Sequence, residues 1–91
     1  MMIAAGNGRE GTVKFLLEKG AKVDSKNIYG WTALALAAQK DNPGIVSALI
    51  AKGADVESRN QDGWTPIMIA THHGCAAVVK ELLAHGAKPA K

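Results

Sequence analysis

The stretch Gly63-Trp64-Thr65-Pro66-Ile67-Met68-Ile69-Ala70 decides the fold, because its beginning already occurs 33 residues earlier as Gly30-Trp31-Thr32. The same offset separates three glycines that are each followed by alanine: Gly20, Gly53 and Gly86. Apolar positions recur at this offset as well: Val13, Val46 and Val79; Leu16, Leu49 and Leu82; Leu17, Ile50 and Leu83. A fixed period of this length indicates a repeat architecture.

Each unit is predicted to be a turn followed by two short antiparallel helices. Thr32 can cap a first helix that runs to about Lys40, and Thr65-Pro66 suits the cap and first position of the equivalent helix. The second helix should begin after Asn42 and end at Gly53, which supplies a left-handed residue. The chain between helix pairs is polar and contains a tight turn at Asp62-Gly63.

The 91 residues divide into three such units within one domain, 1–91. The first unit, 1–26, is incomplete because it begins inside its first helix, whereas 27–59 and 60–91 are full units. A single helix pair has one apolar side that it cannot bury alone. Stacked units bury a continuous core, so we expect the three to form one stack.

These residues resemble the ankyrin repeat family. Gly63–Ala70 is similar to that family's G-x-T-P-L-H-x-A signature, and Gly53-Ala54-Asp55-Val56 is similar to its G-A-D-V segment. The resemblance covers the whole chain and implies an all-α fold, a solenoid of stacked helix-turn-helix units joined by β-turn or hairpin loops. Ala35 and Met68 replace the family's histidine, so its hydrogen bonds to neighbouring turns should be missing.

The ends of the predicted stack do not have the polar faces that terminal repeats normally present. The apolar residues that suggest this are Met1 and Ile3 at one end and Ile67, Ile69, Leu82 and Leu83 at the other. We therefore expect the chain to be a fragment of a longer array or to meet a partner end-on, which includes self-association.

Composition and charge exclude several classes of protein. Hydrophobic residues make up 47% and charged residues 21%, a globular balance, and the net charge of +3 is spread without any Lys/Arg run. Nucleic-acid binding is not expected, because it normally needs a concentrated basic face. No stretch approaches the roughly 20 apolar residues of a membrane span. The lone Cys75 precludes an internal disulfide and favours an intracellular location, cytoplasmic or nuclear.

Two patterns that could suggest a cofactor or a metal fail on their context. Gly6, Gly8 and Gly11 form a literal G-x-G-x-x-G, but a dinucleotide motif must follow a strand, and only five residues precede this one. His72, His73 and Cys75 are close together, but a structural zinc site needs four ligands. We expect no cofactor and no bound metal.

No catalytic constellation is present in the sequence, so the chain is not expected to be an enzyme. None of the serines (Ser25, Ser47 and Ser58) lies in a nucleophile-elbow motif. Cys75 falls near a predicted helix start, a position that can lower the pKa of a thiol, but nothing else indicates that it is activated.

The resemblance implies a protein-interaction module whose partner docks on the concave side, formed by turn tips and inner helices. Transferred position by position, it gives three aromatic anchors, Tyr29, Trp31 and Trp64. It also gives five polar contacts, Gln39, Lys40, Asp62, His72 and His73. In a second interpretation, which can coexist with the first, the tryptophans pack flat on neighbouring turns and stiffen the stack. The alternative function is a structural segment of a longer array that contacts neighbours or itself end-on.

Overall fold

The computed structural model describes the backbone of residues 2–89 and the side chains of residues 4–89. Within these residues there are helices and no strand, so the predicted all-α fold is confirmed. The helices are α1 (Met2–Gly6), α2 (Glu10–Glu18), α3 (Ala33–Gln39), α4 (Pro43–Ala51), α5 (Pro66–His72) and α6 (Ala76–Ala84).

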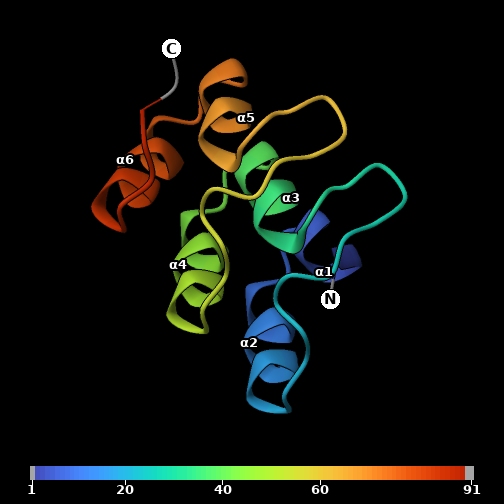
Figure 1. The fold of residues 1–91 in the computed structure, drawn as a ribbon. Coiled ribbons are helices and arrows are strands. Elements are labelled where there is room, and N and C mark those ends of the chain that lie inside the picture. The colour runs from blue at the N-terminus through green and yellow to red at the C-terminus, as the bar shows by residue number, and fades with distance from the viewer. Residues whose placement is uncertain (1, 90–91) are drawn as a thin grey trace.

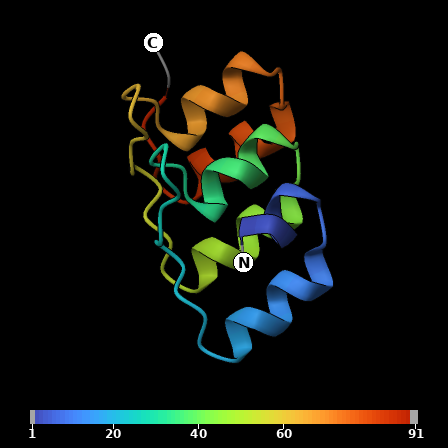
Figure 2. The same ribbon diagram turned by 90° about the vertical axis from the view of Figure 1, so that its right-hand side faces the viewer.

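The helices form two layers (Figure 1). In the inner layer α3 packs between α1 and α5, and in the outer layer α4 packs between α2 and α6. Figure 2 looks onto the inner layer and shows α1, α3 and α5 stacked above one another. The two long turns, around residues 27–31 and 60–64, extend from the stack on the side of the inner helices (Figure 1). The turns and the inner helices therefore share one face of the molecule.

The predicted helix starts are confirmed in atomic detail. Thr32 Oγ1 accepts a hydrogen bond from the Ala35 N–H at 3.2 Å, and Thr65 Oγ1 accepts one from the Met68 N–H at 3.5 Å. These bonds satisfy N–H groups that have no partner within the helix. The glycine after α4, Gly53, has a φ of 91°, as its role in ending the helix requires.

Alanine dominates the middle of the core. In α3, four alanines are buried, namely Ala33, Ala35, Ala37 and Ala38, and Leu34 is the one large side chain buried among them. Such small side chains let neighbouring helices approach closely on both sides. One apolar cluster runs through all six helices, which is how three helix pairs share a single core.

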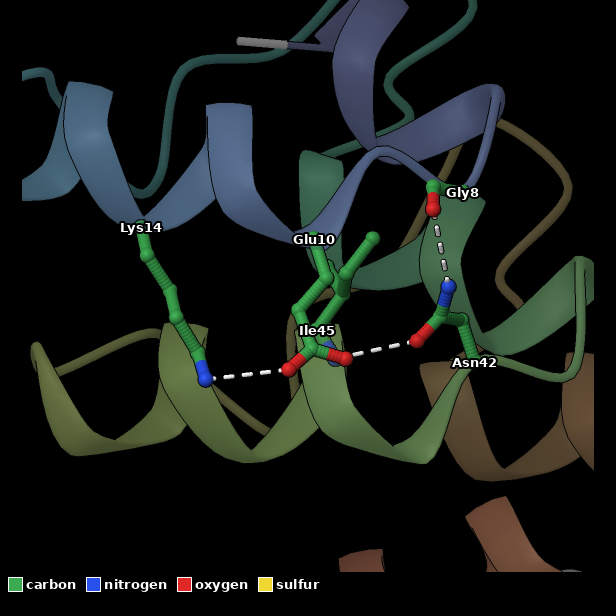
Figure 3. Close-up of polar contacts among 5 residues, drawn as sticks. All are labelled: Gly8, Glu10, Lys14, Asn42 and Ile45. Carbon is green, nitrogen blue, oxygen red and sulfur yellow. Dashed lines mark hydrogen bonds and ion pairs between the residues drawn. The ribbon is translucent and has the colours of Figure 1, made fainter.

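Asn42 links the first two helix pairs (Figure 3). Its Oδ1 accepts from the Ile45 N–H at 3.2 Å and so caps α4, while its Nδ2 donates to the Gly8 carbonyl at 3.5 Å. One side chain thus starts a helix and contacts the loop of the preceding unit.

A charged group lies over the same helix start. Glu10 forms an ion pair with Lys14 at 2.9 Å (Figure 3). Its carboxylate lies where a Cβ on Gly44 would be. Gly44 therefore leaves room for a negative charge beside the N-terminus of α4, where the helix dipole favours it.

The C-terminal end of the stack is less apolar than the sequence suggested. Ile67, Ile69 and Leu82 are buried inside the three-unit core, so the expectation that they form an exposed end is wrong. Of this group only Leu83 is exposed, at 42%. Met1 and the side chain of Ile3 lie outside the described residues.

An open hollow of about 390 Å³ remains at the C-terminal end of the stack, lined by Thr71, Gly74, Cys75, Ala76, Val79 and Lys80.

Cys75 is the N-cap residue of α6, but the position does not activate it. The residue is only 4% exposed, and burial raises the pKa of its thiol. The negative charge of Asp41 raises this pKa further, while a hydrogen bond with the Asp41 backbone lowers it. Burial therefore acts against the lowering of the thiol pKa that a helix start can give.

We expect Cys75 in the native protein to react with a chromogenic disulfide reagent at least about tenfold more slowly than in urea, because only the exposed thiolate reacts. Asp41→Asn should speed the native reaction, since it removes the charge that helps to raise the pKa. Stability should also fall as the pH rises above the ordinary pKa of a thiol, because the folded chain holds this proton more tightly. A native rate equal to that in urea would contradict the assignment.

Asp41 is the one described non-glycine residue with a positive φ, 54°. Gly8 and Gly74 occupy the equivalent positions in the other two units, each with a φ of 70°. Asp41→Gly should therefore stabilise the fold by about 0.5–1 kcal/mol, since the left-handed conformation costs a side-chain-bearing residue energy that glycine avoids. Urea unfolding measures the change. Asp41→Ala, which removes the carboxylate and keeps the Cβ, should show no such gain.

Candidate protein-binding surface

The first long turn is closed by Asn27. Its Oδ1 accepts hydrogen bonds from the Tyr29 N–H at 2.9 Å and the Trp31 N–H at 3.0 Å. The Asn27 N–H donates to the Trp31 carbonyl at 3.0 Å, and the Asn27 carbonyl accepts from the Gly30 N–H, also at 3.0 Å. The backbone on which Tyr29 and Trp31 project is thereby fixed by local chemistry.

The second long turn repeats this construction. Asn60 Oδ1 accepts from the Asp62 N–H at 2.9 Å and the Trp64 N–H at 3.1 Å. Arg59 adds a bond of 2.7 Å from its Nη1 to the Gly63 carbonyl. The two turns thus hold the pairs Tyr29/Trp31 and Asp62/Trp64 at equivalent places.

Gln61 ties the two turns together. Its backbone N–H donates to the Tyr29 carbonyl at 3.1 Å, and its Nε2 donates to the Ile28 carbonyl at 2.8 Å. A Cβ on Gly30 would lie only 3.0 Å from the Gln61 nitrogen, so this close approach requires glycine. These bonds join neighbouring turns. They do not involve the family's histidine, which Ala35 and Met68 replace in this chain.

Two hollows lie between the turns and the inner helices. The first hollow, of about 190 Å³, is lined by Asn27, Tyr29, Trp31, Leu36 and Gln39. The second hollow, of about 180 Å³, is lined by Trp31, Gln39, Asn60, Asp62, Trp64, Ile69 and His73. Trp31 and Gln39 form the wall that the two share. Small-molecule pockets usually measure about 300–1,000 Å³, so each hollow fits a single side chain better.

The structure brings most of the eight predicted contact residues together. Six line the hollows, namely Tyr29, Trp31, Gln39, Asp62, Trp64 and His73. His72 packs edge-on against Trp64, with ring centroids 5.2 Å apart. Lys40 is exposed beyond the end of α3 and lines neither hollow.

The two tryptophans are each partly exposed. Trp64 is 37% exposed, and Trp31 is half-buried as the shared wall of the two hollows. Both interpretations of these residues, stiffening and accessibility, therefore fit the geometry.

The residues that fix the turns and lie at the base of the hollows are not among the eight contact residues predicted from the sequence. Asn27 and Asn60 fix the turns, and Leu36 and Ile69 line the two hollows from the inner helices. The repetition of asparagine after 33 residues was a usable signal, because asparagine closes turns through its own side chain.

The other candidate sites find no geometric support in the described part of the chain. No group of three His, Cys, Asp or Glu side chains there could hold a metal ion. Gly6 ends α1 and Gly11 lies in α2, so the glycine motif joins two helices and does not follow a strand. No helix among these residues is long and apolar enough to cross a membrane.

The comparisons with known proteins agree with this architecture. The family model described as "Ankyrin repeats (3 copies)" matches residues 1–91. The crystal structure of the human ASB11 ankyrin repeat domain superposes with a TM-score of 0.92 at 33% sequence identity. The match covers 96% of this chain and 39% of that domain, so the chain spans about two fifths of its length. No curated protein matches the sequence. Ankyrin repeats are generally protein-interaction modules and typically non-catalytic. The repeated turns, paired helices and family match together show that this chain belongs to the ankyrin repeat family.

Proposed function

We propose that this chain binds a partner protein on its turns and inner helices without catalysing a reaction. It does so as one domain with units 1–26, 27–59 and 60–91. The observation that carries the proposal is the pair of side-chain-sized hollows on this face, walled by Trp31 and Trp64. Large aromatic side chains in such positions are the residues that most often dominate binding energy.

The turns supply rigidity as well as contact area. Asn27 and Asn60 fix the backbone of both turns, so binding costs little ordering of the chain. We assign Tyr29, Trp31 and Trp64 as anchors. We assign Gln39, Lys40, Asp62, His72 and His73 as the polar contacts. The lone cysteine fits a location in the cytoplasm or nucleus.

A second candidate function, an end-on structural role, is favoured by a different feature. The open hollow at the end formed by α5 and α6 is lined mostly by small and apolar groups, and Leu83 is exposed on α6. A neighbouring unit of a longer array, or a second copy, would contact the chain here and leave the turns free.

We expect the double variant Trp31→Ala/Trp64→Ala to lose at least about tenfold in capture of a partner from cell lysate, since anchor residues each contribute about 2 kcal/mol or more. The backbone hydrogen bonds of the turns do not involve the indoles, so the variant should fold. Equal helicity and melting, measured by circular dichroism, are required before the capture is compared.

Phe15→Ala is the matched control, because Phe15 is an aromatic residue that is 56% exposed on α2, in the outer layer. It should leave capture unchanged. The variant Tyr29→Ala/Asp62→Ala tests the same surface through exposed residues should the tryptophan variant melt early. Capture that survives both surface variants but is lost in Leu83→Lys would instead support the end-on role.

A further inference from the structure

The two hollows are equivalent by position but differ in charge. Most lining positions match in character after 33 residues: Asn27 and Asn60, Trp31 and Trp64, Leu36 and Ile69. At the turn tip, however, the first hollow has Tyr29 and the second has Asp62. Asp62 and His73 line only the second hollow, so the two otherwise similar binding places differ by one carboxylate and one imidazole.

The carboxylate of Asp62 has no described partner of its own. Its backbone N–H bonds to Asn60, but the ion pairs among the described residues are Lys14–Glu10 and His85–Glu81. The basic side chain of the same turn, Arg59, donates to the Gly63 carbonyl and lines a different hollow, together with Glu57 and Lys88 among others. Asp62 is exposed at the edge of the second hollow and is free to meet a charge on a partner.

The rest of the second hollow suits a cation with an apolar stem. Trp31 and Trp64 present indole rings, whose faces attract lysine and arginine head groups. Ile69 lies at the base of this hollow on α5 but is only 1% exposed, so the indole rings supply the apolar surface for the methylene groups of such a side chain. The volume of about 180 Å³ accommodates one side chain.

We propose that the second hollow binds the positively charged end of a lysine or arginine from the partner, while the first hollow takes an uncharged side chain. The inference rests on the proposed function and names the chemistry of the segment that the surface recognises. Packed helices lie roughly 8–10 Å apart, so hollows above α3 and α5 are separated by a similar distance. An extended segment rises about 3.3 Å per residue, which places its basic and uncharged residues about three positions apart.

The test is a selection of random twelve-residue displayed peptides on the immobilised 91-residue chain, followed by affinity measurements on the winners. We expect the selected peptides to share one lysine or arginine. Asp62→Asn should weaken their binding about three- to fivefold, the effect of one exposed ion pair. Selection on Asp62→Lys should replace the basic residue with an acidic one.

Asp62→Asn is expected to preserve the turn, because the bond to Asn60 uses the backbone N–H of residue 62. Glu18→Gln is the matched control: it changes the net charge equally at an exposed residue of α2. It should leave the affinity of the peptides unchanged, and salt should weaken wild-type binding more than Asp62→Asn binding.

The outcomes separate this inference from the function on which it rests. Peptides that need Trp31 and Trp64 but carry no basic residue, with Asp62→Asn binding them equally well, would overturn the charge assignment and leave the binding surface standing. Failure to select any peptide that depends on the two tryptophans would overturn both.

Discussion

The close approach of neighbouring inner helices is the constraint on which the rest of the structure depends. It is achieved with alanine, since four of the seven residues of α3 are buried alanines and few large side chains separate the helices. Because the helices are close, the turns that precede them are close as well, and Gln61 can bond directly to the backbone of the preceding turn. Gly30 is required there for the same reason. A larger residue in α3 would therefore separate the turns as well as the helices.

The turns are built so that their shape does not depend on what binds. In each, one asparagine bonds two N–H groups of the turn, and the tryptophan that follows starts from a fixed backbone. This division of roles lets the side chains at the tip vary without changing the fold. Tyr29 and Asp62 occupy the same place in the repeat although they share no chemistry, which is the behaviour expected of residues that serve recognition.

Much of the fold could be predicted from the sequence, because local rules and the 33-residue period agree. Thr32, Asn42 and Thr65 cap helices as their types predict, and Gly53 has the expected left-handed backbone. What could not be predicted depends on the direction of side chains across the stack. Ile67, Ile69 and Leu82 have the sequence pattern of an end face, yet all three are buried in the folded chain.

Stacking of the units also determines the environment of Cys75 and the outline of the candidate surface. A helix start alone favours a reactive thiol, but the neighbouring unit buries the sulfur and places Asp41 near it, which sequence spacing does not reveal. Likewise, the repeat alignment placed Tyr29, Trp31, Asp62 and Trp64 on turns, but only the folded stack shows that Trp31 is shared by two hollows. Repetition thus creates two equivalent places, and stacking joins them into one surface. The carboxylate of Asp62, which has Tyr29 at the equivalent place, makes the two ends of this surface chemically different, as the proposed recognition of a charged and an uncharged side chain requires.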